Sequence, residues 1–371
     1  MLIISNADVA QLLSMGDAIN ALDMAYRELA TTDAVCKPRS DLQIPTKKPG
    51  KVYQWSSVEG GSTSGYFAIR MKSDIIFEQE YNGARTQEKY CMQPGTYCGL
   101  IFLTNSETGE PLAILNDGLT QLTRVGADGG LGVRYLAKEN AEVIGMLGSG
   151  GMSRTHMEAF MHVRPGIQRL QVYSPTKANR ERFASEMAEK YGIQAKACDT
   201  PEEIYRDADI TAALTDSAVL VVNGPLLKKG THLVAPGTGD GIKDRAVLDR
   251  IDVYMRFGNA TTHWGASGEG ADDEYYTYAA RPDIDTGFKR KTPGKRGHGA
   301  MFAAERTMTY TDIVNGLAKG RTSPDQISYS ERGNLQGNQF WPLAGRVYEL
   351  AKQRGLGKEI PTEWFLQDIR N

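Results

Sequence analysis

The feature that most constrains the fold is an apolar run that ends in a glycine-rich loop. Residues 143–147 are apolar, glycines follow at 148, 150 and 151, and a helical pattern begins at residue 152. A strand that enters a helix through Gly-x-Gly is typical of dinucleotide binding, because the turn is tight and the helix N-terminus offers free N–H groups to a pyrophosphate. Ser153 stands where G-x-G-x-x-G has its third glycine. The alternative is a purely structural turn. The residues predicted to hold the cofactor here are Gly148, Ser149, Gly150, Gly151 and Met152.

Strand and helix patterns alternate from this loop onward. Apolar β-like runs occupy residues 170–173, 210–214, 232–235 and 251–257, and helical patterns occupy residues 152–163 and 178–191. Such alternation favours a parallel sheet covered by helices. We therefore expect an α/β chain with a Rossmann dinucleotide-binding domain.

The segments before residue 143 show a different pattern of predicted secondary structure. A helical pattern over 15–29 precedes short, mostly antiparallel β-like runs, while residues 60–62 and the polar stretch 78–89 are typical of loops. The helix expected over 117–138 contains many glycines, which weaken a helix, so we expect another backbone to pack closely against it. An amphipathic helix over 341–354, ended by Gly355, closes the chain.

Residues at other strand ends indicate which cofactor is bound. No carboxylate follows the strand at 170–173, where one would accept from the ribose 2′-OH of NAD. Ser174, Thr176 and Lys177 could instead receive a 2′-phosphate, which favours NADP(H); the alternative is a surface lysine beside a tolerant pocket. Thr215 and Gly237 end later strands and complete the predicted cofactor site. Asp240 is a candidate general acid or base, or a ligand for a substrate amine, or a turn residue.

Four basic residues before the cofactor unit are bordered by apolar residues. An Arg or Lys is costly to bury without an anion, and a substrate carboxylate would satisfy several at once. The alternative for each is an exposed edge position or an internal salt bridge. The candidates are Arg39, Arg70, Lys72 and Arg124.

Composition excludes several functions. The 43 Lys+Arg against 45 Asp+Glu give a net charge of −2, which offers no electrostatic footprint for nucleic acid. We expect the basic run at 289–296 to be a solvated loop. The sequence has no run of about 20 apolar residues, the length that a membrane-spanning helix needs, and its first residues do not resemble a signal peptide. Four separated cysteines are expected to stay reduced, in the cytoplasm, and no metal site is predicted.

The order of these segments resembles the ornithine cyclodeaminase/mu-crystallin family. The resemblance covers most of the chain and is most specific from Thr108-Gly109-Glu110-Pro111 to Arg124. The segments that carry it are residues 38–39, 67–72, 108–118 and 122–127, the loop from Gly148 to His156, and the glycine edge at Gly237.

The resemblance implies a Rossmann NAD(P)-binding domain over 123–316 and an α+β substrate-binding and dimerisation domain over 1–122 with 317–371. It implies a homodimer, a substrate carboxylate held by Arg39, Lys72 (or Arg70) and Arg124, and a catalytic role for Lys72 and Asp240. This sequence departs from the family pattern at two positions. Arg70, and not Lys72, aligns with the family's lysine if the alignment allows no shift. Asp240 lies one residue later than the family's catalytic acid. An insertion over 74–92 could reshape the pocket.

The function expected is an NAD(P)H-dependent oxidoreductase that acts on the C–N bond of a small amino or imino acid. The first alternative is a cyclodeaminase that uses its cofactor catalytically and releases ammonia. The second is a non-catalytic, crystallin-like protein that binds NADPH.

Overall fold

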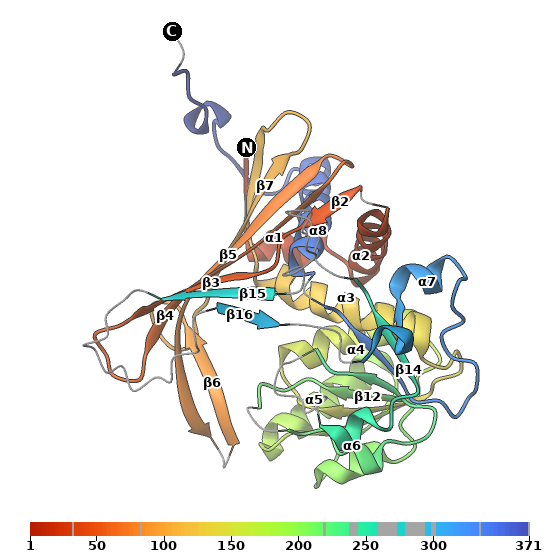
Figure 1. The fold of residues 1–371 in the computed structure, drawn as a ribbon. Helices are drawn as coiled ribbons and strands as arrows, with labels where there is room; N and C mark the ends of the chain where they lie inside the picture. The colour runs from red at the N-terminus through yellow and green to blue at the C-terminus, as the bar shows by residue number, and fades with distance from the viewer. Residues whose placement is uncertain are drawn as a thin grey trace.

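Two β-sheets organise the chain, which we describe from a computed structural model (Figure 1). One sheet is mostly antiparallel and the other is entirely parallel in the pairs that the structure describes. No helix in the described part of the chain has the length and apolar character needed to cross a membrane. The described residues are 1–31, 33–81, 84–217, 220–236, 244–258, 273–278, 294–297, 302–333 and 335–369.

The mostly antiparallel sheet is built from both ends of the chain. Its main path runs β16-β15-β3-β4-β5-β7-β8-β1-β19, with β2 paired to β4 and β6 to β5. The amino group of Met1 donates to the carbonyl oxygen of Ile360 at 3.1 Å, so the first and last strands lie together. The strands are β1 (Leu2–Ile4), β2 (Ala34–Cys36), β3 (Ser40–Pro45), β4 (Val52–Ser62), β5 (Tyr66–Tyr81), β6 (Ala84–Tyr90), β7 (Cys98–Asn105), β8 (Pro111–Asn116), β15 (Asp273–Tyr278), β16 (Gly294–Gly297) and β19 (Lys358–Glu359).

The parallel sheet is the Rossmann domain. Its order is β11-β10-β9-β12-β13-β18-β14-β17, so the chain moves outward from β9 in both directions and the strand order reverses there. Such a reversal creates a crevice at the carboxyl ends of the central strands, where open α/β sheets bind ligands. The strands are β9 (Val143–Leu147), β10 (Arg169–Tyr173), β11 (Gln194–Ala197), β12 (Ile210–Ala213), β13 (His232–Val234), β14 (Val253–Arg256), β17 (Thr307–Thr309) and β18 (Ser328–Glu331).

Helices cover both sheets (Figure 1). On the Rossmann side, α3 packs on α4, while α8 packs on β4 and β5 of the other sheet and also on α2. Two large buried side chains, Trp341 and Phe340, put α8 in the same core as α2. The helices are α1 (Asn6–Leu12), α2 (Met15–Ala30), α3 (Gly118–Leu136), α4 (Gly151–Val163), α5 (Lys177–Tyr191), α6 (Arg245–Leu248), α7 (Tyr310–Val314), α8 (Gln336–Arg354) and the 3-10 turns η1 (Pro201–Tyr205), η2 (Gly224–Leu226), η3 (Ala304–Arg306) and η4 (Thr362–Phe365).

The predicted α/β fold class is confirmed, and two segments cross the predicted boundaries. The strand β18 lies in the parallel sheet although it follows residue 316, and β15 pairs with β3 although it precedes that residue. The division into residues 1–122 with 317–371 and residues 123–316 stays a prediction in its detail.

The glycines of α3 allow close approach of α4, as predicted. A Cβ at Gly126 would lie 2.7 Å from the carbonyl oxygen of Thr155, and one at Gly130 would lie 3.0 Å from the Cβ of Ala159. A Cβ at Gly129 would lie 2.7 Å from the ring of His156. The small residues thus let two helices that carry parts of the candidate site pack against each other with little separation.

Two stretches predicted to be loops are strands. Residues 60–62 extend β4, where Gly60 pairs with Cys36 and Ala68. Residues 78–81 and 84–89 lie in β5 and β6, which pair from Ile75 with Tyr90 to Tyr81 with Ala84. Main-chain hydrogen bonds across this hairpin outweigh the weak strand propensity of its polar side chains. Part of the basic run, residues 294–297, is also a strand; residues 289–293 lie outside the described part of the chain.

The fully buried His156 makes stability depend on pH. Burial lowers its pKa to about 4, although the hydrogen bond between Nδ1 and the carbonyl oxygen of Met152, at 2.7 Å, acts in the opposite direction. The unfolded chain, with a histidine pKa near 6.5, therefore binds the proton first as the pH falls. We expect the free energy of unfolding to decrease by about 3 kcal/mol on this account between pH 6.5 and 4.

Urea titrations at several pH values would measure this slope. The His156→Gln variant should lose the corresponding part of the pH dependence, whatever its stability at pH 7. An unchanged slope in that variant would contradict the assignment.

Candidate cofactor and substrate site

The turn after β9 has the geometry that a bound diphosphate requires. Gly148 has a φ of +110°, which side chains rarely adopt, and a Cβ there would lie 2.2 Å from the carbonyl oxygen of Leu214. Its N–H donates to the carbonyl oxygen of Tyr173 at 2.8 Å, which ties the loop to β10. Only glycine satisfies both conditions, so the loop is fixed at the reversal of the strand order.

The N-terminus of α4 faces open space. Gly150 is the N-cap residue, and no side chain there accepts a hydrogen bond from the N–H groups of the first turn. A Cβ at Gly150 would have nothing within 4 Å. Ser153 is fully buried, and its Oγ has no hydrogen-bond partner among the described residues. Uncapped N–H groups at a helix N-terminus attract anions. The residues therefore fit the diphosphate of a dinucleotide.

Arg154 holds the loop from the side of α4. Its Nη1 donates to the carbonyl oxygens of Ser149 at 3.1 Å and Gly150 at 3.3 Å. Its guanidinium also pairs with Glu186 of α5 and lies over the ring of Phe183. The loop conformation is thus fixed before any ligand binds.

The residues predicted to select the cofactor lie at the end of β10. The Oγ atoms of Ser149 and Ser174 are 2.8 Å apart, so these two predicted residues meet. Arg180 donates to the carbonyl oxygen of Ser174 at 3.0 Å. Thr176 is the N-cap of α5, and Lys177 is largely exposed and pairs with Glu181 at 3.7 Å. Hydroxyl and basic groups thus surround this edge.

Other strand ends complete the edge. Thr215 follows β12, and its Oγ1 accepts from the N–H of Ser217 at 3.1 Å. Ser217 in turn forms an antiparallel bridge with Thr86 of β6, which brings the long hairpin of the other sheet to the cofactor edge. Gly237 and Asp240 lie outside the described residues.

The basic residues predicted to bind substrate share one face of the antiparallel sheet. Side chains alternate along a strand, so Arg70 and Lys72 of β5 point the same way. In the register, Lys72 pairs with Ser56 and Ser56 with Asp41, which puts Arg39 near the same face. This is the face that α8 covers further along, where Gly60 meets Gly337.

Three of the four cations form internal salt bridges, which is the alternative that the sequence offered to binding a substrate carboxylate. Lys72 lies 2.8 Å from Asp74, and the Nε of Arg39 lies 2.9 Å from Asp41. Arg70, only 5% exposed, pairs with Asp117 at 2.6 Å. The Asp117 carboxylate fits there because residue 99 is glycine: a Cβ at Gly99 would lie 2.1 Å from it.

Arg124 differs from the other three. It is buried, and among the described residues no carboxylate lies within ion-pair distance of it; its partners are the neutral side chains of Gln121 and Gln339. The ring of Phe340 lies under both Arg124 and Arg70, at 5.2 and 5.3 Å. Burial, and then the neighbouring Arg332, lower the pKa of Arg124 well below its usual value. A buried cation with only neutral partners is suited to receive an anion.

The helix α3 joins the cation face to the glycine loop. A Cβ at Gly151 would lie 3.5 Å from Cδ1 of Leu122, two residues before Arg124. Gln339 connects Arg124 to a buried pair by donating to the hydroxyl of Tyr26 at 2.6 Å and to Asp128 at 3.2 Å. Substrate and cofactor groups held by these elements would therefore be neighbours.

Two basic residues near the site were not predicted from the sequence. Arg332 follows β18, and its buried Nε has no hydrogen-bond partner among the described residues; no strand was predicted at 328–331, so nothing in the sequence indicated that Arg332 ends one. Lys89 lies in β6, inside the stretch predicted to be a loop. Desolvation of its ammonium group, and then the charge of Lys72, lower its pKa to about 8, although the residue as a whole is exposed to solvent.

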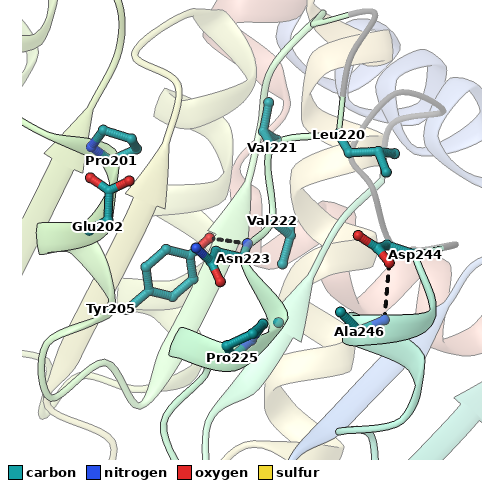
Figure 2. A pocket seen from close by; sticks show the side chains of 11 residues that line it. Pro201, Glu202, Tyr205, Leu220, Val221, Val222, Asn223, Pro225, Asp244 and Ala246 are labelled. Carbon is teal, nitrogen blue, oxygen red and sulfur yellow. Dashed lines mark hydrogen bonds between the residues drawn. The ribbon is translucent and has the colours of Figure 1, made fainter.

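Two cavities lie away from these groups. One, of about 310 Å³, is lined by Glu202, Tyr205, Asn223 and Asp244 among others, and Asn223 N–H donates to the Tyr205 hydroxyl there (Figure 2). The other, of about 400 Å³, lies between α2 and α8 and includes Arg346. Neither includes a residue of the glycine loop or a predicted substrate cation, so neither is the candidate site.

Comparison with known proteins agrees with this geometry. A profile of the ornithine cyclodeaminase/mu-crystallin family matches residues 2–333. The chain belongs to this family. Its relatives include a Delta(1)-pyrroline-2-carboxylate reductase of Bacillus cereus, which is 26% identical over 360 residues that cover 97% of this chain and 99% of the relative.

Solved structures of this family share the fold. The Delta(1)-pyrroline-2-carboxylate reductase of Thermococcus litoralis, in complex with NADH and L-proline, has a TM-score of 0.70 at 21% identity, over 97% of this chain and 100% of that chain. An archaeal alanine dehydrogenase dimer with bound NAD has a TM-score of 0.71 at 23% identity, over 97% and 99%. The family and the fold predicted from the sequence are thus confirmed.

The strain at Gly148 gives a direct test of the cofactor edge. Gly148→Ala should abolish binding of NADH and NADPH, because the added Cβ meets the carbonyl of Leu214 and an alanine resists this φ. Nucleotide fluorescence would measure binding. Gly166→Ala is the matched control, since a Cβ there has open space and an ordinary φ. Binding retained by Gly148→Ala would exclude this loop as the diphosphate site.

Proposed function

We propose that this member of the ornithine cyclodeaminase/mu-crystallin family is an NAD(P)H-dependent reductase of small imino acids, or the dehydrogenase that catalyses the reverse reaction. The observation that carries the proposal is the position of Arg124, a buried cation without an ion-paired carboxylate among the described residues, on the helix that contacts the glycine loop. The names of the relatives, a pyrroline-carboxylate reductase and an alanine dehydrogenase, support the same reaction class.

Arg124, Lys72 and Arg39 would bind the substrate carboxylate, with Arg70 behind them. Arg70 is already neutralised by Asp117, while Arg124 has only amide oxygens as partners, so the carboxylate would replace the weaker interactions of Arg124 first. Fixing the carboxylate orients the adjacent C=N carbon, and hydride transfer depends chiefly on such positioning.

A bound nicotinamide would supply a hydride to this carbon. A proton must reach the nitrogen in the same reaction, and we propose Lys72 or Asp240 as its source. The Nζ of Lys72 lies 2.8 Å from Asp74, which holds the ammonium in place. The products are the amino acid and the oxidised cofactor, so electrons and protons balance.

Cofactor use separates the alternatives. A cyclodeaminase would return the hydride after ammonia leaves, so it would show no net change in nicotinamide absorbance. A crystallin-like protein would bind nucleotide without turnover of any imine. A reductase consumes one cofactor for each amino acid formed.

We favour NADP(H) over NAD(H). Ser174 and Thr176 at the end of β10, and the exposed Lys177 beside them, offer hydroxyl and cationic groups to a 2′-phosphate. The related solved structures hold NADH and NAD, which supports a nicotinamide cofactor of either form. Comparison of the two Kd values, in the wild type and in Lys177→Ala, would test this preference.

The most direct kinetic test combines a substrate panel with an Arg124 variant. Mixtures of 2-oxo acids with ammonia or methylamine should oxidise NAD(P)H in the wild type, and Arg124→Ala should lower kcat/KM by about 100-fold or more, since a charge-assisted bidentate contact is lost. Arg346→Ala is a control, because this arginine lies at the separate cavity between α2 and α8. Turnover unchanged in Arg124→Ala would contradict the carboxylate role.

We propose that the chain forms a homodimer through the outer face of the antiparallel sheet. Leu42 and Ile44 of β3 are 46% and 48% exposed, and they pair with Trp55 and Tyr53 on the face opposite the cations. Leu100 of β7 is exposed on the same sheet. An exposed apolar face of this kind indicates an interface, and the archaeal relative is a dimer.

A double charge substitution would test the dimer. Leu42→Asp with Ile44→Asp should give a monomer in light scattering, because two carboxylates would be buried at the interface. Leu317→Asp, at a position 77% exposed, is the control and should leave the mass unchanged. A wild-type protein that is monomeric at micromolar concentration would refute the proposal.

We also propose a cytoplasmic location and a small-molecule partner only. The basis is the sequence: four widely separated cysteines without CxxC spacing, in a chain this long, are typical of a reducing compartment. The near-neutral net charge of −2 gives no reason to expect nucleic acid.

A further inference from the structure

Lys89 extends the cation face beyond the groups that would bind the substrate carboxylate. In the β5–β6 hairpin it pairs with Ile76, which places it on the same face as Asp74, Lys72 and Arg70. Its ammonium lies within electrostatic range of Lys72 and Asp74, and of Arg39 and Arg70. The hairpin insertion therefore adds a lysine to the end of the cation face opposite Arg124.

The charges on this face do not balance. Three carboxylates pair with three cations: Asp41 with Arg39, Asp74 with Lys72, and Asp117 with Arg70. Lys89 and Arg124, at the two ends of the cation face, have no ion pair in the described part of the chain. Glu78 is the next carboxylate on the face of Lys89, and it forms no ion pair with Lys89. Lys89 and Arg124 thus leave two positive charges for a ligand, in addition to Arg332, which neighbours Arg124 and whose buried Nε has no hydrogen-bond partner among the described residues.

The position of Lys89 is held by the fold. Its strand β6 is paired with β5 along seven residue pairs, and Thr86, three residues earlier, bridges to Ser217 at the cofactor edge of the Rossmann domain. The neighbouring Tyr90, on the opposite face, is buried and in contact with Lys51. Lys89 is therefore a fixed part of the wall between the two domains.

We propose that Lys89 binds a second carboxylate, on the side chain of the substrate, so that the preferred substrates are 2-imino dicarboxylic acids and the corresponding dicarboxylic amino acids. An α-carboxylate at Arg124 and a side-chain carboxylate at Lys89 satisfy both unpaired charges. Lys89 is exposed to solvent, but its ammonium group lies near Lys72, Arg39 and Arg70, so it gains more from an anion than an isolated surface lysine does. The lowered pKa of Lys89, about 8, agrees with such surroundings. The catalytic part of this inference rests on the proposed function; the binding part does not.

The kinetic test compares substrates of equal chain length. With ammonia and NAD(P)H, the wild type should use 2-oxoglutarate better than 2-oxopentanoate in kcat/KM by about 10- to 100-fold, the range of a hydrogen bond to a charged group. Lys89→Gln should remove most of this preference through KM, while Lys89→Arg should keep it. Lys51→Gln, which removes a charge that lies against the opposite face of this hairpin beside Tyr90, should keep it as well.

A preference for the monocarboxylate, or a ratio unchanged in Lys89→Gln, would overturn the inference and leave the reductase proposal intact. If no imine is turned over, the reductase proposal fails instead. Calorimetry with glutarate and pentanoate on the protein saturated with NADP⁺ then decides: the inference requires tighter binding of glutarate in the wild type, lost in Lys89→Gln. Equal affinities would refute it.

Discussion

The burial of positive charge on one face of an antiparallel sheet is the constraint on which the rest of this structure depends. Along β5 the covered face changes from Ala68 to Arg70 and Lys72, so the sheet passes from an apolar core to a charged surface within a few residues. Burying a cation costs several kcal/mol unless an anion compensates it. The chain supplies Asp41, Asp74 and Asp117 for that purpose, and a glycine at position 99 makes room for the last of these.

Arg124 has no compensating carboxylate among the described residues. It lies on the helix that joins the antiparallel sheet to the Rossmann half of the molecule. Its helix α3 carries the glycines that let α4 approach, and α4 begins at the diphosphate-binding loop. The packing that brings the two helices together therefore also brings an uncompensated guanidinium next to the cofactor edge. Gln339, Tyr26 and Asp128 hold the guanidinium from behind through a buried hydrogen-bond network. Such a preformed arrangement favours a ligand that carries its own carboxylate.

The Rossmann half was predictable because its signals are local. The apolar run at 143–147, the glycines that follow and the alternation of periods each depend on neighbouring residues, and the strand β9 matches the prediction residue for residue. The hairpin of β5 and β6 was not predictable in this way. Its described residues 78–81 and 84–89 are mostly polar, and they form two strands because these strands pair with each other over a long register. For the same reason Lys89 was missed, since its place on the cation face follows from that register and not from its neighbours in sequence.

The residues of the candidate site were also predictable only in part. Ser149 and Ser174 are 25 residues apart in sequence and were both predicted from strand ends, and they meet within 2.8 Å. For Arg39, Arg70 and Lys72, the residue types suggested a substrate carboxylate or a salt bridge, and no acidic partner was predicted for them. Asp41 and Asp74 each lie two residues after their partners Arg39 and Lys72, so strand alternation could have suggested them. Asp117 is 47 residues from Arg70, and only the tertiary structure identifies it.

The measurement that tests the central claim most directly is the transfer of deuterium from the cofactor. Nicotinamide dinucleotides carrying two deuterium atoms at C4 of the reduced ring would be incubated with the protein, a 2-oxo acid and ammonia, and the amino acid would be examined by mass spectrometry. The account predicts one deuterium at the α-carbon for each cofactor oxidised. Cofactor oxidation without label in an amino acid, or tight binding of the nucleotide with no transfer to any 2-imino acid, would contradict it.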